Sequence, residues 1–274
     1  MTCSLAFEES GPPTAPAVLL LHGFMGSRRD WVRVAAALSL THRCIAVDLP
    51  GHGETGDRGH DENRGGAAGC DPDLWTPDGC VAALARILAA AGGGSVVGYS
   101  LGGRLALQLA IEHPDVVARS VIVSASPGIA GEPARQARRD EDEHRARRLE
   151  TQGLEPFLDE WYRLPLFAPL REHPGFPEVL ERRRRNDPRL LARSLRTMGV
   201  GNQRSLWGDL PGLRTPLLFL AGERDAKFTS LAFDAVALCP HAEAVILRAR
   251  GHALVEEDPE AVARETAGFL GTGQ

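Results

Sequence analysis

An α/β fold with a mostly parallel central sheet is predicted by three features of the sequence. Short apolar runs alternate along the chain with segments of helical periodicity, which is typical of strand–helix–strand units. The first such run, residues 17–21, is apolar without interruption, as expected of a strand buried on both faces of a sheet. With 274 residues, 43% of them hydrophobic, the chain can also bury one large core.

Strands and helices are expected in regular order on either side of a central insertion. Thr76 is a suitable N-cap for one helix, with Pro77 at the first helical position, and three glycines at 92–94 end that helix. The Gly-rich, polar stretch 54–78 predicts a mobile surface loop. The strands are expected at 17–21, 43–47, 95–97, 120–123, 215–222 and 244–247, and the helices at 28–40, 80–91, 105–110, 231–238 and 259–270.

The alternation stops after Ser124. The segment 127–209 has no β-branched run, many arginines and two helical patterns around an aromatic-rich stretch. Inserted between two strands of a parallel sheet, it predicts a helical cap over the carboxyl ends of the strands, where ligands bind in open α/β folds. The core would then comprise residues 1–126 and 210–274, and the cap residues 127–209.

Charge and cysteine content limit the classes of function. The net charge is −5, yet residues 127–204 hold 16 arginines and 13 carboxylates, so a basic insertion is joined to an acidic body. An acidic chain whose basic runs lack interleaved aromatic residues is not expected to bind nucleic acid. No apolar run is long enough for a membrane span and no signal peptide is apparent. Five cysteines without metal-ligand spacing predict a reduced, cytoplasmic protein without a metal site.

The motif Gly98-Tyr99-Ser100-Leu101-Gly102 lies between a short apolar run and a segment of good helix formers. G-x-S-x-G between a strand and a helix predicts a nucleophile elbow, in which the small residues permit a sharp turn that exposes the Ser100 hydroxyl. The N–H of Leu101, at the start of the helix, would be free to bind an oxyanion. In α/β-hydrolases the loop after an earlier strand supplies a second such N–H, which here would be that of Phe24.

A base and its orienting acid are expected further along the chain. Asp225 and His252 each follow a predicted strand, and the order Ser100, Asp225, His252 is the one found in this fold. His252 would accept the serine proton and Asp225 would fix the imidazole tautomer. Glu223, two residues earlier, is the alternative acid.

Asp48 and His52 also suggest catalytic groups by residue type. Both precede the serine and lie in the Pro/Gly-containing segment 48–53, so a structural role is favoured for both.

Six segments together resemble the 2-succinyl-6-hydroxy-2,4-cyclohexadiene-1-carboxylate synthases of menaquinone biosynthesis. The likeness covers nearly the whole chain, and its most specific parts are the elbow with its trailing arginine, the Trp-Tyr pair and the Glu-Arg-Asp-x-Lys-Phe stretch. The loop at 54–78 departs from the family pattern by its greater length. The segments are Leu21-His22-Gly23-Phe24, residues 48–53, residues 98–104, Asp159-Glu160-Trp161-Tyr162, Pro165-Leu166-Phe167 and residues 222–228.

The resemblance implies a lyase that eliminates pyruvate from 2-succinyl-5-enolpyruvyl-6-hydroxy-3-cyclohexene-1-carboxylate, without hydrolysis and without a cofactor. Such a substrate bears three carboxylates, and arginines are the side chains best suited to hold them. Arg104 lies four residues after Ser100 and therefore on the same face of the helix. Position in the matched cap implies Arg138 and Arg183 as the other two clamps, with Arg184 as the alternative for a shifted helix register.

The resemblance also implies a pocket lined by Tyr99 and Trp161, with Lys227, the only lysine, beside the triad acid. Packing within the cap is the other interpretation of Trp161. A monomer that takes a small tricarboxylate substrate is expected. Two other classes stay open: a carboxylesterase or carbon–carbon bond hydrolase with the same triad, and a catalytically idle hydrolase fold that only binds a ligand.

Overall fold

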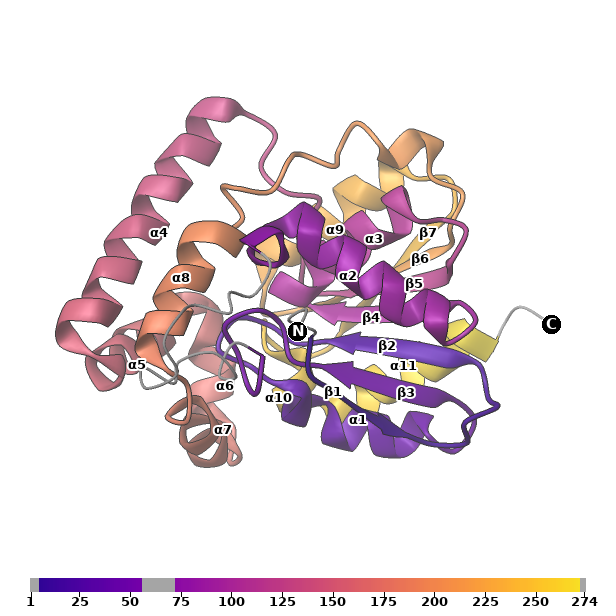
Figure 1. The fold of residues 1–274 in the computed structure, drawn as a ribbon, viewed down its shortest axis with the longest axis horizontal. Coiled ribbons are helices and arrows are strands. Elements are labelled where there is room, and N and C mark those ends of the chain that lie inside the picture. Colours follow the sequence, from indigo (N-terminus) through magenta and orange to yellow (C-terminus); the bar gives the residue numbers. More distant parts are fainter. Residues whose placement is uncertain (1–4, 56–71, 272–274) are drawn as a thin grey trace, which may run out of the picture.

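The computed structural model describes residues 5–55 and 72–271, and within them a seven-stranded sheet forms the centre of the molecule. The strand order is β1-β3-β2-β4-β5-β6-β7, and all neighbours are parallel except β1 and β3. The α/β fold class expected from the sequence is therefore confirmed (Figure 1). The strands are β1 (Phe7–Ser10), β2 (Ala17–Leu21), β3 (Arg43–Val47), β4 (Gly94–Tyr99), β5 (Val117–Val123), β6 (Leu217–Gly222) and β7 (Ala242–Leu247).

Helices cover both faces of the sheet, with α2, α3 and α9 on one side and α1 and α11 on the other (Figure 1). The helices are α1 (Val32–Leu38), α2 (Pro77–Ala90), α3 (Leu101–Glu112), α4 (Glu132–Gln152), α5 (Leu154–Arg163), α6 (Ala168–Glu172), α7 (Phe176–Arg183), α8 (Pro188–Met198), α9 (Ala226–Leu238), α10 (Leu254–Glu257) and α11 (Pro259–Gly271). Short 3-10 helices are η1 (Arg28–Trp31), η3 (Pro72–Trp75), η4 (Pro165–Phe167) and η5 (Leu210–Gly212).

The alternation of side chains along β2 explains how one apolar run supports two cores. Leu19 and Leu21 pack in the cluster shared with α2 and α3, whereas Val18 and Leu20 pack in the cluster shared with α1 and α11. All four side chains are fully buried. An uninterrupted apolar strand is required because both of its faces are covered.

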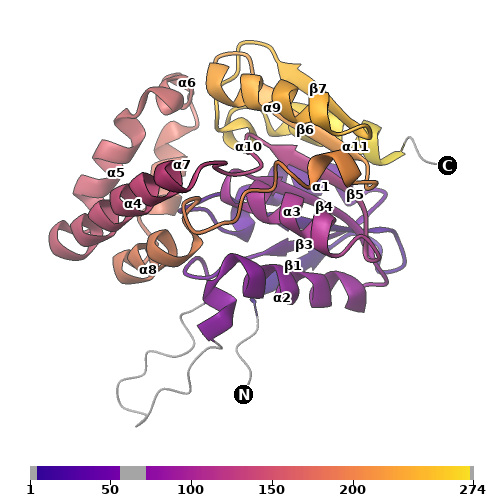
Figure 2. The same cartoon turned by 90° about the horizontal axis from the view of Figure 1, so that it is seen from above.

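Helices α4 to α8 form a separate layer beyond the carboxyl ends of the strands (Figures 1 and 2). The arrows of β2, β3 and β4 point toward this layer in Figure 1. All five helices fall inside the insertion expected at 127–209, although the sequence indicated only two helical patterns there.

Several boundaries differ from those expected. The edge strand β1 was not expected, because its four residues are exposed and show no apolar alternation. The helix expected at 28–40 begins as η1, and the helix expected at 231–238 begins five residues earlier, at Ala226. Thr76 does cap α2, since its hydroxyl oxygen accepts a hydrogen bond of 3.1 Å from the N–H of Gly79.

The prediction of a mobile loop at 54–78 is wrong for the carboxyl-terminal part of that range. Leu74 and Trp75 are buried in η3, and α2 begins at Pro77. Residues 56–71 of that predicted loop lie outside the described residues. In the part of the chain that is described, no helix is long and apolar enough to cross a membrane.

Candidate active site

Ser100 lies in a sharp turn between β4 and α3, with φ of 51° and ψ of −106°. Such a conformation is strained for a residue with a Cβ. Two glycines make the turn sterically possible. A Cβ on Gly98 would lie 2.1 Å from the carbonyl oxygen of Gly102, and one on Gly102 would lie 2.2 Å from that of Leu21. The tight strand–turn–helix expected from the motif is present.

Ser100, His252 and Asp225 lie together at the carboxyl edge of the sheet. Nε2 of His252 is 3.4 Å from Oγ of Ser100, and Nδ1 of His252 is 2.7 Å from Oδ2 of Asp225. The histidine is 3% exposed and the aspartate 5% exposed. The contact with aspartate is short and buried, whereas the contact with serine is long, as is common before a ligand binds. The arrangement can move a proton between the serine hydroxyl and the imidazole.

The alternative acid does not contact the histidine. The carboxylate of Glu223 accepts a hydrogen bond of 2.8 Å from the N–H of Ala249, and the residue is exposed.

Asp48 and His52 have structural partners, as the sequence favoured. The carboxylate of Asp48 pairs with Arg28 and accepts hydrogen bonds from the N–H groups of Arg28 at 2.7 Å and Glu54 at 2.9 Å. His52 is 1% exposed and its Nδ1 lies 3.0 Å from the carbonyl oxygen of Pro50. Burial lowers the pKa of His52 to about 3, so this imidazole is neutral over the physiological range.

The two expected oxyanion donors lie in segments that touch each other. The N–H of Gly102 donates a hydrogen bond of 3.1 Å to the carbonyl oxygen of His22. A Cβ on Gly23 would lie 2.7 Å from the ring of Tyr99, so the loop before Phe24 packs directly on the elbow. Among the described residues, the N–H groups of Phe24 and Leu101 donate to no protein acceptor. Both are therefore free to bind an oxygen atom that acquires negative charge.

A cavity of about 490 Å³ lies between the sheet edge and the cap. Every site residue expected from the sequence except Asp225 lines this cavity, and Asp225 lies behind His252. Five cations and two carboxylates line it, an excess of three positive charges. The charged lining residues are Arg104, Arg138, Arg145, Arg183, Lys227, Glu141 and Glu256.

Among the four arginines that line this cavity, Arg104 is the one whose charge is least compensated by neighbouring carboxylates. Its guanidinium donates hydrogen bonds to Oε1 of Gln203 at 2.8 Å and to the carbonyl oxygen of Met198 at 3.0 Å, both neutral acceptors. Among the described residues it has no carboxylate within ion-pair distance. Burial and the neighbouring charge of Arg138 lower the pKa of Arg104 to about 9, against a smaller opposing effect of the Asp142 carboxylate. A buried cation without a directly paired carboxylate is costly, and an anionic ligand would reduce that cost.

Arg138 and Arg145 share one buried carboxylate on α4. Nε of Arg138 lies 2.9 Å from Oδ1 of Asp142, and a nitrogen of Arg145 lies 3.3 Å from the same oxygen. The guanidinium of Arg145 also lies over the ring of Trp161, 5.5 Å from its centre. Arg145 was not among the residues expected from the sequence. Its spacing of seven residues from Arg138, two turns on the same helix, could have indicated it.

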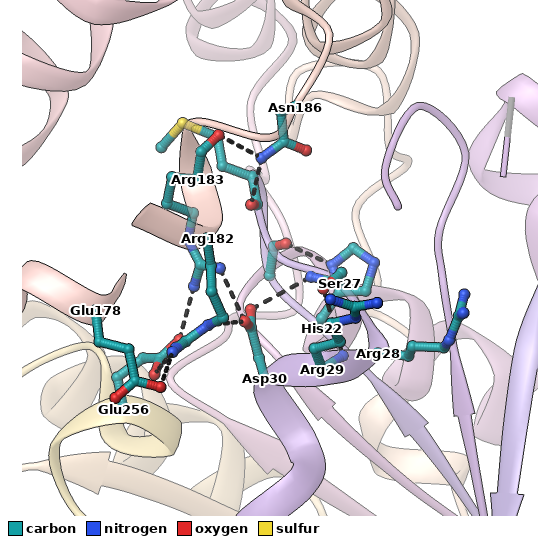
Figure 3. A network of polar contacts seen from close by, with 12 residues as sticks. His22, Ser27, Arg28, Arg29, Asp30, Glu178, Arg182, Arg183, Asn186 and Glu256 are labelled. Atoms are coloured by element: carbon teal, nitrogen blue, oxygen red, sulfur yellow. Dashed lines mark hydrogen bonds and ion pairs between the residues drawn. The ribbon is translucent and has the colours of Figure 1, made fainter. Parts of the chain in front are cut away.

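Arg183 lies in the cavity wall, but its guanidinium already donates hydrogen bonds to three protein acceptors. It donates to Oδ1 of Asp30 at 2.8 Å, to Oε1 of Glu256 at 2.7 Å and to the hydroxyl of Tyr162 at 3.3 Å. The neighbouring Arg182 contacts the same two carboxylates (Figure 3). We call Asp30, Arg182, Arg183 and Glu256 the cap–core ion cluster. Arg183 therefore has less uncompensated charge than Arg104.

The cap–core ion cluster joins α7 of the cap to η1 and α10 of the core. Asn186 adds a further link by donating to the carbonyl oxygen of Met25 at 2.9 Å (Figure 3). Burial would raise the pKa of Asp30, but the charge and hydrogen bond of Arg183 outweigh it and lower that pKa. Asp30 is thus a carboxylate at neutral pH and holds both arginines in place.

The alternative clamp Arg184 does not line the cavity. Its side chain is 41% exposed and pairs with Glu155 and Glu181 on the outer face of the cap.

Three further expected residues lie at the cavity with different degrees of exposure. Trp161 is half-buried and stacks on Phe157 at a ring distance of 5.6 Å, so it both packs within the cap and lines the cavity. The buried ring of Tyr99 lies 5.7 Å from that of His252. Lys227 is exposed, with its ammonium 5.5 Å from the ring of Phe228. The residues described contain no group of three or more side chains that could hold a metal ion.

The profile of the Alpha/beta hydrolase family matches residues 18–265, and the chain belongs to this family. The chain is 32% identical over 268 residues to the 2-succinyl-6-hydroxy-2,4-cyclohexadiene-1-carboxylate synthase of Salmonella schwarzengrund. That match covers 95% of this chain and 96% of the relative. Within the α/β hydrolases the chain is therefore a member of the 2-succinyl-6-hydroxy-2,4-cyclohexadiene-1-carboxylate synthase family, which confirms the resemblance seen in its motifs.

A solved structure of MenH from S. aureus agrees with this placement. It superposes with a TM-score of 0.86 at 31% sequence identity, and the match covers 97% of each chain. The chain is also 32% identical over 217 residues to the Arabidopsis thaliana protein PHYLLO, chloroplastic, but it spans only 12% of that protein's length.

Proposed function

We propose that this enzyme eliminates pyruvate from 2-succinyl-5-enolpyruvyl-6-hydroxy-3-cyclohexene-1-carboxylate to give 2-succinyl-6-hydroxy-2,4-cyclohexadiene-1-carboxylate, in menaquinone biosynthesis. Arg104 is the observation that carries the proposal, because a buried guanidinium whose hydrogen-bond partners are all neutral lines the same cavity as Ser100 and His252. A neutral ester would leave that charge uncompensated, whereas a carboxylate of the substrate would pair with it. A cytoplasmic monomer without a cofactor belongs to the same proposal.

In the proposed mechanism the triad acts as a general base. His252 accepts the proton of Ser100 as the serine oxygen removes a proton from the substrate ring, and Asp225 stabilises the imidazolium that forms. The electron pair released moves through the ring and breaks the carbon–oxygen bond to the enolpyruvyl group. Enolpyruvate leaves as its enolate, takes up the proton held by His252 and becomes pyruvate by tautomerisation, so no acyl-enzyme forms and no water is consumed.

Two sets of groups would stabilise the charge that develops. The N–H groups of Phe24 and Leu101 would bind the succinyl carbonyl oxygen as it takes up the dienolate charge, where the loss of one such donor typically costs roughly 3 kcal/mol. Arg104, Arg138 and Arg183 would hold the substrate carboxylates, with Tyr99, Trp161 and Lys227 around them. Arg145 joins this set because it lines the same cavity.

Incubation of the purified enzyme with the enolpyruvyl substrate tests the proposal, with pyruvate followed through a coupled dehydrogenase. Release of one pyruvate for each substrate consumed is expected. Hydrolysis of nitrophenyl esters at rates typical of natural esterases, without pyruvate release, would favour the carboxylesterase or carbon–carbon bond hydrolase. Failure of a fluorophosphonate to label Ser100 would favour the idle fold.

Replacing Arg104 by alanine is expected to lower kcat/KM for the enolpyruvyl substrate by about 10- to 100-fold, because a charge-assisted hydrogen bond contributes roughly 1.5–3 kcal/mol. Cleavage of a neutral nitrophenyl ester should fall far less, since such an ester has no carboxylate for the guanidinium to bind. Steady-state kinetics with both substrates measures the difference. An equal loss on both would contradict the clamp.

A further inference from the structure

Gln203 lies in the segment between α8 and β6, and its side chain connects the cap linker to the nucleophile helix. It is 1% exposed. Its Oε1 accepts the 2.8 Å hydrogen bond from Arg104, and its Nε2 donates to the carbonyl oxygen of Arg104 at 3.1 Å. One side-chain amide therefore forms hydrogen bonds with both the backbone and the guanidinium of the same arginine.

The orientation of this amide is fixed by a chain of partners. Nε2 of Gln108 donates to the carboxylates of Asp78 at 2.6 Å and Glu112 at 3.1 Å, so Oε1 of Gln108 is directed elsewhere. That oxygen accepts a hydrogen bond of 3.3 Å from Nε2 of Gln203. With its nitrogen directed at two oxygens, Gln203 can present only its oxygen to Arg104.

The partner of Arg104 differs from those of the other arginines of the cavity. Arg138 and Arg145 pair with Asp142, and Arg183 pairs with Asp30 and Glu256. A glutamate at position 203 would have the same shape as glutamine and would pair with the guanidinium, but its second oxygen would face the two oxygens to which Nε2 of Gln203 now donates. The amide satisfies both of these oxygens and aims the guanidinium, yet it gives the guanidinium no paired carboxylate.

We propose that Gln203 is a positioning residue that determines specificity: it directs Arg104 into the cavity through a neutral acceptor and so reserves the charge of Arg104 for a carboxylate of the ligand. The identity of that ligand rests on the proposed function. The claim about charge does not, because it concerns any small polycarboxylate that enters the cavity.

The variant Gln203→Glu tests the claim by supplying an internal counter-ion of the same size. We expect KM for the enolpyruvyl substrate to rise on the order of 10- to 100-fold, the range for a charge-assisted hydrogen bond. We expect kcat to change less than about threefold, since the triad is untouched. Gln152→Glu is the matched control, because it makes the same charge change on the exposed end of α4, and it should leave KM unaltered.

A second variant separates charge from shape. Gln203→Met removes the hydrogen bonds but adds no charge, so KM should rise only a few-fold. The melting temperature of Gln203→Met, measured by circular dichroism, should be no higher than that of Gln203→Glu. If Gln203→Met raises KM as much as Gln203→Glu does, the charge argument is overturned.

A double-mutant cycle shows whether the effect passes through Arg104. In an Arg104→Ala background, Gln203→Glu should raise KM by less than about threefold. An undiminished effect in that background would mean that the new carboxylate repels the substrate directly, and the positioning role would be wrong.

Calorimetric titration with citrate keeps this test independent of the proposed function. Should the wild type release no pyruvate, the lyase assignment fails, yet citrate should still bind the wild type at least tenfold more tightly than it binds Gln203→Glu. Equal affinities, or no binding of citrate to the wild type, would overturn the inference itself.

Discussion

Alanine at position 100 is expected to lower pyruvate release on the order of 10²- to 10⁴-fold, the usual contribution of a positioned general base. The Ser100 hydroxyl is the group that His252 can reach, at 3.4 Å from Nε2, and alanine removes it without changing the volume of the turn appreciably. The coupled dehydrogenase assay measures the loss.

The effect of this substitution should be confined to catalysis. Alanine meets the same strain as serine at φ of 51°, so the melting temperature should change little. Ser230→Ala, an exposed serine on α9, is the matched control and should retain full turnover. Unimpaired turnover of Ser100→Ala would remove the serine from the mechanism.

Loss of the Asp30 carboxylate should cause the largest change in stability. Asp30→Ala leaves Arg182 and Arg183 with Glu256 as their shared buried partner, and breaking a buried pair in this way typically costs about 3–5 kcal/mol. Urea unfolding followed by circular dichroism measures the free energy of unfolding. Pyruvate release should also fall, because Arg183 loses one of the groups that hold it in the cavity wall.

Glu178→Ala gives the control for this prediction within the same group of residues (Figure 3). Glu178 also pairs with Arg182, but its side chain is 81% exposed, so its removal should cost less than about 1 kcal/mol. Comparable costs for the two substitutions would show that the cap–core ion cluster does not anchor the cap.

Local sequence patterns were sufficient to predict that Ser100, Asp225 and His252 lie together and to predict most of the sheet. A nucleophile elbow needs glycines at fixed spacing around Ser100, and a strand buried on both faces needs an uninterrupted apolar run. Asp225 and His252 were identified because chain order in this fold restricts the candidates. Each of these signals lies within a few residues or follows from topology.

The ion and amide partners could not be predicted because they join distant positions. Asp30 and Arg183 are 153 residues apart, and Gln203 is 99 residues from Arg104. An amide carries no motif, so nothing in the sequence distinguished Gln203. The number of cap helices was wrong for a related reason: α4 buries only Asp142, Ala146 and Leu149, and therefore lacks the apolar stripe by which a helix is recognised.

The placement of α4 to α8 beyond the strand ends separates two properties of the enzyme. The proposed triad lies in loops at the strand ends, whereas three of the four cavity arginines belong to one continuous insertion. Exchange of that insertion would therefore change most of the positive charge of the cavity, but Arg104, which belongs to α3, would stay beside Ser100.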